Sequence, residues 1–438
     1  MKTKLGALAY ILLFPIVTLT AQSSDLPSSH PKVGQPMPDF VLKRVDYFSK
    51  TEATLEDFRG KWLFLDFWFP GCVSCIKAFP KVNQLQAAFK DEIQFVMVGL
   101  NSRMHRHVER VYEGLRKKMG LNLVVAYDSV LVETWQIYSM PHIIVVDPQG
   151  IVRYITSGVD LTSQKLERLL EGEHITLKPK DSDVTAGQMT KSLCLGGFDS
   201  ASLYESHLMH WTGEEHYSAP IDFQVQKGSY FRAVKVPLVQ LYNLAYVGKA
   251  VWDMDDSLYA KFYPKPILNL SDSSFFQYDY KADTGMYNYY LKPLDKASSK
   301  SQVMNALQKE LHDIFGYDVY IQDVQIPIWK LVASSDARSR VRTKGGKYHY
   351  YESPSGFSVR NFPAERLLNL VVRYISNKYT IFVDETGLSG NIDLSVDALM
   401  TDWNDLCDGL RRNGFDLVRG FKEMKVLVIN DPEVSRGN

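Results

Sequence analysis

The chain has 438 residues, of which 45% are hydrophobic and 12% aromatic, a composition that excludes an intrinsically disordered protein and exceeds what one ordinary domain needs. Lysine plus arginine and aspartate plus glutamate each number 50, so the formal charge is zero, and no excess of basic residues indicates binding to nucleic acid or to an anionic membrane. We therefore expect at least two globular domains.

The first 22 residues predict a secretory signal peptide. Two lysines precede an apolar stretch at 5–18, and Ala21 is a small residue suited to cleavage. The alternative is an uncleaved membrane anchor, but the stretch is short for a bilayer span and contains Pro15. We expect export to the periplasm or cell envelope, where disulfides persist, and a leader at 23–35 that is rich in Ser, Pro and Gly.

Strand and helix signals alternate over residues 36–172. Short β-branched or aromatic runs predict strands at 62–67, 93–98, 121–126 and 143–146. Apolar residues at helical spacing predict helices at 75–89, 108–119, 130–138 and 162–170. This alternation predicts a largely parallel sheet covered on both faces.

Cys72 and Cys75 form a Cys-x-x-Cys pair where the first strand should turn into a helix. A helix that begins at the first cysteine points unpaired N–H groups and the positive end of its dipole at that sulfur, which stabilises thiolate over thiol. Cys75, one helical turn on, can attack a mixed disulfide at Cys72 and release the reduced partner. The pattern predicts a redox-active disulfide with Cys72 as nucleophile and Cys75 as resolving thiol.

A zinc site and a purely structural disulfide are the other interpretations of this pair. Zinc needs two more ligands at matching spacing, and the remaining cysteines, Cys194 and Cys407, are isolated. A bridge around so short a loop restrains little of the unfolded chain. We expect no metal, because the histidines at 105, 107 and 207–216 lack a ligand pattern and fit solvated surface better. Cys194 and Cys407 either pair with each other or stay two free buried thiols.

Asp66 lies six positions before Cys72 in an otherwise apolar strand. Burial there would raise the pKa of its carboxyl group and let it exchange a proton with Cys75. The alternative is a carboxyl group that points to solvent from the strand edge.

Seven residues around the pair form a larger pattern. They are Asp66, Trp68, Cys72, Cys75, Pro80, Met140 and Pro141. This pattern resembles the thioredoxin superfamily, in its exported TlpA-like and ResA-like branch, over residues 36–172. The resemblance implies an α/β thioredoxin-like fold with an inserted helix and strand at 105–126.

The resemblance also implies roles for individual residues. Asp66 would be the proton-transfer group for Cys75, and Pro141 would follow a cis peptide bond and face the disulfide. Met140 would pair its backbone with an extended substrate, and we place Trp68 with Met140 and Pro141 at the substrate-binding site, packed under the helix that follows Cys72. Val73 and Ser74 replace the proline-containing spacers common in the family, so a redox potential does not carry over.

The remaining chain reads as a polar linker at 173–190 and an α+β domain at 191–438. The sequence contains an internal repeat, because residues 236–244 resemble residues 362–371, and residues 307–326 resemble residues 410–428. Each unit reads as an amphipathic helix, a glycine stop and strands, which predicts two related halves.

Three segments of this second domain resemble an uncharacterised domain of exported soil-bacterial proteins, a resemblance that implies no activity. They are residues 231–246, 384–390 and 425–429. Dense aromatic residues at 275–290 fit a buried sheet face better than a carbohydrate or peptide platform.

Together these features predict an exported thiol–disulfide oxidoreductase that reduces disulfides in protein substrates. Its electrons would come from a membrane donor or a thiol protein, because no nicotinamide or flavin motif is present and no cofactor is expected. One alternative is a peroxidase of the peroxiredoxin class, which would require Thr or Ser where Phe69 stands. The other is a scaffold protein in which 191–438 holds a cell-envelope partner and the redox site regulates it.

Overall fold

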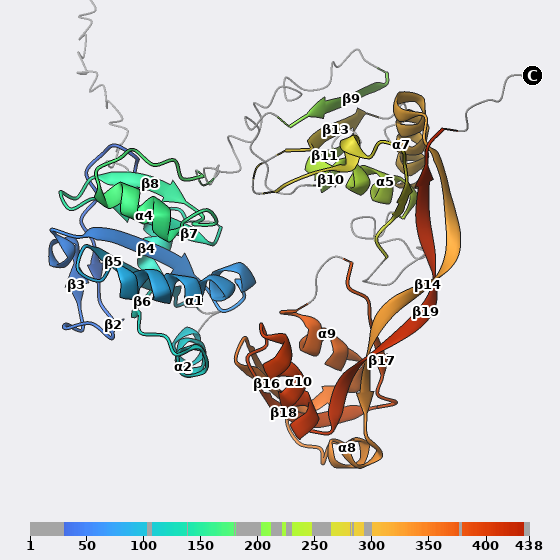
Figure 1. Cartoon of the computed structure of the whole chain (residues 1–438). Helices are drawn as coiled ribbons and strands as arrows, with labels where there is room; N and C mark the ends of the chain where they lie inside the picture. The colour runs from blue at the N-terminus through green and yellow to red at the C-terminus, as the bar shows by residue number, and fades with distance from the viewer. Residues whose placement is uncertain are drawn as a thin grey trace, which may run out of the picture.

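The computed structural model describes residues 30–102, 107–137, 139–178, 180, 203–211, 221–224, 230–247, 264–280, 282, 284–292, 300–375 and 379–432. The predicted signal peptide, most of the predicted leader and residues 181–190 of the predicted linker lie outside these ranges. Figure 1 shows a first domain, coloured blue to green, beside a second domain, coloured green-yellow to red. None of the helices in the described ranges is long and apolar enough to cross a membrane.

A six-stranded sheet forms the centre of the first domain, in the order β2-β6-β5-β4-β7-β8. Its strands are β2 (Val45–Asp46), β4 (Trp62–Trp68), β5 (Ile93–Leu100), β6 (Val124–Asp128), β7 (His142–Val146) and β8 (Val152–Thr156). Its helices are α1 (Val73–Ala88), α2 (Val108–Met119), α3 (Val130–Thr134) and α4 (Ser163–Leu170). Two short strands, β1 (Val41–Leu42) and β3 (Ala53–Thr54), and the 3-10 turn η1 (Leu55–Phe58) precede β4. This is the expected thioredoxin-like fold, with α2 and β6 as the inserted helix and strand.

The expectation of a largely parallel sheet is wrong. Only β4 with β5 and β5 with β6 pair in parallel, whereas β7 runs antiparallel to β4 and β8 antiparallel to β7. β2 is also antiparallel to β6. The tight turn at 147–150 joins β7 to β8 as a hairpin and makes that pair antiparallel, because a parallel pair would need a long crossover. The predicted helix at 130–138 also ends early, at Thr134, before Gln136 adopts a positive φ of 55°, and the strand predicted from 121 begins at Val124.

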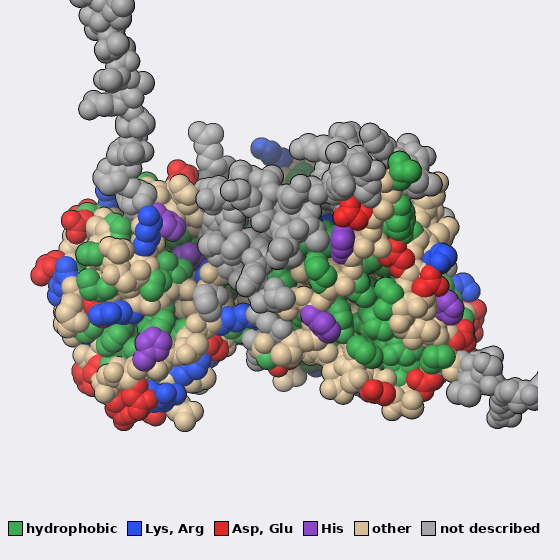
Figure 2. Space-filling model, turned by 90° about the horizontal axis from the view of Figure 1, so that it is seen from above, with side chains coloured by type: hydrophobic (Ala, Val, Ile, Leu, Met, Phe, Trp, Pro, Cys, Tyr) green, Lys and Arg blue, Asp and Glu red, His purple; other side chains and the backbone are tan. Residues whose placement is uncertain are grey.

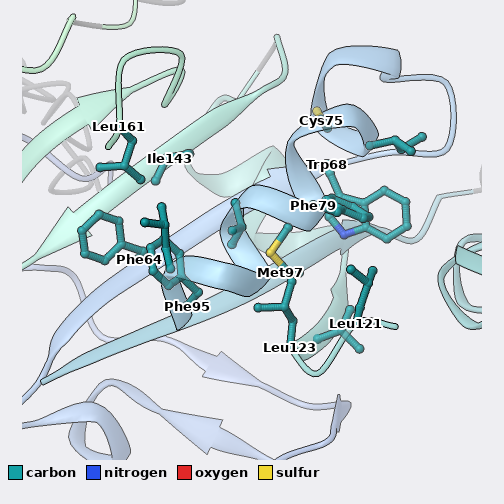
Figure 3. Packing of buried hydrophobic residues seen from close by; sticks show 14 of the residues in the cluster. Phe64, Trp68, Cys75, Phe79, Phe95, Met97, Leu121, Leu123, Ile143 and Leu161 are labelled. Carbon is teal, nitrogen blue, oxygen red and sulfur yellow. The ribbon is translucent and has the colours of Figure 1, made fainter. Parts of the chain in front are cut away.

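Buried side chains fill both faces of this sheet. On β4 they alternate, so that Phe64 and Trp68 belong to the cluster under α1 and α2, while Leu65 and Phe67 belong to the cluster on the opposite face. Figure 3 shows the first cluster, in which the ring of Trp68 lies beside that of Phe79, a residue of the helix that also carries Cys75. Each fully buried aromatic or aliphatic side chain contributes about 1.5–3 kcal/mol. Lys, Arg, Asp and Glu side chains are interspersed over the outer surface of this domain (Figure 2).

The first domain continues past its predicted end at residue 172. Ile175 and Leu177 are buried in the cluster that contains both cysteines, and the backbone N–H of Lys180 donates to the carbonyl of Ile155 in β8 at 2.9 Å. Residues 173–178 and 180 are therefore part of the domain, although their polar composition suggested a linker.

The second domain consists of two halves that share the order of their main helices and strands (Figure 1). The first half contains β9 (Glu205–His210), β10 (Ile221–Gln224), β11 (Tyr230–Pro237), α5 (Leu238–Tyr246), β12 (Ile267–Asn269), η2 (Ser274–Phe276), β13 (Met286–Lys292), α7 (Lys300–Phe315) and β14 (Asp318–Ala333). The second half contains α8 (Ser335–Arg340), β15 (His349–Ser353), β16 (Gly356–Pro363), η3 (Ala364–Arg366), α9 (Leu367–Val372), β17 (Phe382–Glu385), β18 (Asn391–Asp397), α10 (Trp403–Arg412) and β19 (Phe415–Asn430). The order β11-α5-β12-β13-α7-β14 recurs as β16-α9-β17-β18-α10-β19, in agreement with the predicted repeat.

The two halves also share a local irregularity and exchange strands. A β-bulge interrupts β11 and β16 just before their final proline, with positive φ at Lys235 (52°) and Asn361 (49°). The long strands β14 and β19 pair antiparallel along their whole length, from Asp318 with Asn430 to Ala333 with Phe415. The end of β19 then pairs with β12 of the first half, and the end of β14 with β17 of the second half.

Candidate redox site

A disulfide joins Cys72 and Cys75, with the two Cα atoms 5.3 Å apart. Phe69, Pro70 and Gly71 form a turn in which the Cys72 N–H donates to the Phe69 carbonyl at 2.9 Å. Cys72 is the N-cap of α1, and the Cys75 N–H donates to its sulfur at 3.3 Å. The unpaired N–H groups and positive dipole end of α1 thus point at the Cys72 sulfur, and this arrangement stabilises a thiolate there once the disulfide is reduced.

Asp66 lies beneath the helix that carries the disulfide. It shares a face of β4 with Phe64 and Trp68 and is only 4% exposed. Its Oδ1 atom has no hydrogen-bond partner among the described residues. Burial raises the pKa of this carboxyl group from 3.8 to about 7, partly offset by the positive charge of Lys180. A carboxyl group with this pKa can accept or release a proton near neutral pH.

The peptide bond between Met140 and Pro141 is cis, as the resemblance implied. It lies in the loop before β7, the strand that pairs with β4 next to Asp66. Met140 and Pro141 are partly exposed, so a substrate backbone can reach them.

The sequence patterns did not indicate Lys180, which holds this loop from a distant part of the chain. Its Nζ atom donates to the carbonyl of Ser139 at 2.7 Å and also to the carbonyl of Pro141. One ammonium group therefore contacts the backbone on both sides of the cis bond and acts electrostatically on Asp66. No local pattern could reveal these contacts, because they join positions 41 and 39 residues apart.

The structure contradicts the substrate-binding role assigned to Trp68. Its side chain is 0% exposed, and its ring meets Phe79 of α1 edge to face, with the ring centroids 5.2 Å apart. A ring enclosed in the core cannot contact a substrate. Trp68 instead supports α1 from below, as its predicted packing required.

The histidine clusters do not form a metal site in the part of the chain described. His107 is the residue before α2 and its ring contacts that of Tyr351, and His207 Nε2 lies 2.7 Å from Glu205 Oε1. Within the described ranges, no three His, Cys, Asp or Glu side chains converge on one point. His105 and His216 lie outside those ranges.

Cys407 is a free thiol buried in the second half of the second domain. Burial raises the pKa of this thiol. Cys194, its suggested disulfide partner, lies outside the described residues.

Known proteins share the first domain. Residues 33–155 match the AhpC/TSA family. The thiol-disulfide oxidoreductase ResA of Geobacillus kaustophilus is 30% identical over 144 residues, which cover 32% of this chain and 76% of that protein. The thioredoxin-like protein YneN of Bacillus subtilis is 27% identical over 169 residues, covering 37% of this chain and 96% of that protein. A crystal structure of a putative thiol:disulfide interchange protein DsbE from Chlorobium tepidum has 25% sequence identity and a TM-score of 0.26, and the match covers 32% of this chain and 94% of that one.

Proposed function

Because the chain belongs to the thioredoxin-like thiol–disulfide oxidoreductases of the ResA type, we propose that it is exported and reduces disulfide bonds in other proteins through Cys72 and Cys75. The observation that carries this proposal is the disulfide at the N-terminus of α1 with a buried carboxyl group beneath it. The apolar stretch after two lysines at the N-terminus supports export.

The reaction transfers two electrons to the substrate. The Cys72 thiolate attacks one sulfur of the substrate disulfide, forms a mixed disulfide, and expels the other substrate sulfur as a thiolate that takes up a proton. Cys75 then loses its proton and attacks the Cys72 sulfur, which releases the second substrate thiol and re-forms the Cys72–Cys75 disulfide. A reduced dithiol protein or a membrane thiol donor must return two electrons before the next cycle.

Asp66 is the proton acceptor that we propose for Cys75. An ordinary carboxyl group would be ionised and too weak a base at neutral pH, whereas the pKa of Asp66 is about 7. Met140 and Pro141 would present backbone groups to an extended segment of the substrate beside Cys72.

A peroxidase function has less support. Phe69 occupies the position three residues before Cys72, where a peroxidase would need a hydroxyl group to orient peroxide. The AhpC/TSA match concerns a fold that both activities share and does not separate them. A scaffold function for the second domain remains compatible with a reductase activity of the first.

Insulin reduction tests the proposal. The chain lacking residues 1–22, supplied with dithiothreitol, should reduce insulin disulfides, and Cys72→Ser should abolish the gain over dithiothreitol alone. Cys75→Ser should accumulate a mixed disulfide with insulin, and Cys407→Ser, a change at a buried cysteine remote in sequence, should retain activity. A Cys72→Ser variant with the wild-type rate would refute the assignment.

A further inference from the structure

The second half of the second domain packs against the first domain beside the disulfide. Val73, which lies between the two cysteines, contacts the hydrophobic core of that half. Leu399, which follows β18, contacts the core cluster that contains Cys72 and Cys75. Each domain thus places an apolar side chain against the core of the other.

Polar contacts extend this interface along α2. The guanidinium carbon of Arg110 lies 3.9 Å from the centre of the Tyr351 ring, and Lys118 Nζ lies 2.9 Å from Asp397 Oδ1 and 3.9 Å from Asp405 Oδ2. Cation–π contacts and exposed ion pairs contribute about 0–1 kcal/mol each. In Figure 1, α2 lies on the side of the first domain that faces β16 and β18.

The two domains approach each other closely at one point of this interface, and a cavity surrounds that point. A Cβ atom added to Gly114 of α2 would lie 2.5 Å from the Ser355 Oγ atom and 3.0 Å from its Cβ atom. A cavity of about 370 Å³ lies around this contact, between α2 and the sheet of β15, β16 and β18. Incomplete packing and weak polar contacts are typical of interfaces that separate at low cost.

A substrate protein must bring its own disulfide to the Cys72 sulfur. Adjacent Cα atoms are about 3.8 Å apart, and Val73 directly follows Cys72, so the half that contacts Val73 lies next to the residue that carries this sulfur. Cys72 is only 5% exposed in this arrangement. A folded substrate and the docked half therefore require the same space.

We propose that the second half of the second domain occupies the surface of the first domain beside Cys72 and competes with substrate proteins for that surface. A protein substrate then reaches Cys72 only after this half has moved away. This inference rests on the proposed reductase function. Competition lowers the apparent affinity for a protein substrate by the fraction of molecules that are open. A competing substrate would need to replace these contacts with an apolar side chain for Val73, an aromatic ring for Arg110 and an acidic group for Lys118.

Gly114→Ala tests this competition because its methyl group should clash with the second domain and weaken the docking. Alanine is favoured over glycine in a helix by about 1 kcal/mol, so α2 remains folded, while the new methyl group meets Ser355. Adding Ser355→Gly removes both atoms that the methyl group meets and provides the matched control. Ser355→Gly alone should behave like the wild type.

We expect Gly114→Ala to raise the ratio of insulin reduction to reduction of the small disulfide 5,5′-dithiobis(2-nitrobenzoate). A tenfold increase would correspond to about 1.4 kcal/mol of lost docking free energy, and the double variant should return the ratio towards the wild-type value. An unchanged or lower ratio in Gly114→Ala would overturn the inference.

A second measurement separates this inference from the proposed function. If neither the wild type nor Gly114→Ala reduces insulin, the proposed function is wrong, and docking is then judged from alkylation of the Cys72 thiol in a Cys75→Ser background. Gly114→Ala should increase labelling by a maleimide attached to a 5-kDa polymer relative to labelling by N-ethylmaleimide. The same relative labelling in both proteins would show that the second domain does not restrict access.

Discussion

Replacing Asp66 by Asn should stabilise the first domain, and the gain should grow with pH. The pKa of Asp66 is 3.8 in an unfolded chain and about 7 in the folded domain, so the folded state binds more protons between these values. Stability consequently falls as pH rises through that window. At about 1.36 kcal/mol per pKa unit, ionising the buried group costs roughly 4 kcal/mol, a cost that asparagine does not carry.

Urea unfolding of the oxidised protein, followed by tryptophan fluorescence, measures this effect at pH 4 and pH 8. The difference between Asp66→Asn and wild type should be small at pH 4, where the folded carboxyl group is neutral, and should approach about 4 kcal/mol at pH 8. Any constant offset from the amide group cancels when the two pH values are compared. A difference that is equal at both pH values would refute the assignment of a buried carboxyl group with a raised pKa.

Lys180→Met should raise the pKa of Asp66 further, because the opposing positive charge is lost, whereas Lys180→Arg should keep it near the wild-type value; a carboxyl titration by NMR that does not move in Lys180→Met would contradict this role. Gly99→Ala should destabilise the first domain by about 1–3 kcal/mol, because the added Cβ would lie 2.9 Å from Val108 Cγ2 and 3.3 Å from Trp68; Val108→Ala in the same chain should recover part of the loss in urea unfolding. Cys407 should react with N-ethylmaleimide far more slowly in the native protein than in urea, since its thiol is buried, and equal rates would show that the core cluster around α10 does not enclose it.

The sequence predicts the redox site best where the local sequence pattern and the packing of the folded domain favour the same helix or strand. The apolar run before Cys72 predicts a buried strand, and the Cys-x-x-Cys pair predicts a helix that begins there; the structure has β4 and α1 at these positions. The same apolar neighbours predict that Asp66 is buried. Trp68 was misassigned because both faces of β4 are buried and its ring lies in the cluster under α1 and α2, and a family pattern does not show which side chains are exposed.

Contacts between distant segments could not be predicted from local patterns. Lys180 lies in a polar stretch that resembles a linker, and the burial of Ile175 and Leu177 in the core together with the hydrogen bond from the Lys180 N–H to the Ile155 carbonyl brings it to the cis-proline loop. Val73 and Leu399 each contact the core of the other domain. These contacts join segments more than 300 positions apart, and no periodic pattern in the sequence indicates them. The internal repeat did predict two related halves of the second domain. It did not predict that strands of one half pair with strands of the other, because the register between them is decided by packing.

The exchange of strands bears on how access to Cys72 can be controlled. Pulling the two halves of the second domain apart would break the ladder between β14 and β19, which pairs every residue from Asp318 to Ala333 with one from Phe415 to Asn430. It would also break the parallel pairings of β12 and β17 with the ends of those strands. In the described part of the chain, by contrast, the contacts between the domains are made by side chains, as at Val73, Arg110 and Lys118, and by the hydrogen bond from Lys178 Nζ to the Tyr280 carbonyl at 3.2 Å. A motion that exposes the disulfide at low cost must therefore move the whole second domain as one unit away from α2. Such a motion breaks only the few contacts between the domains, so one methyl group added at Gly114 is expected to be enough to shift the protein towards the open arrangement.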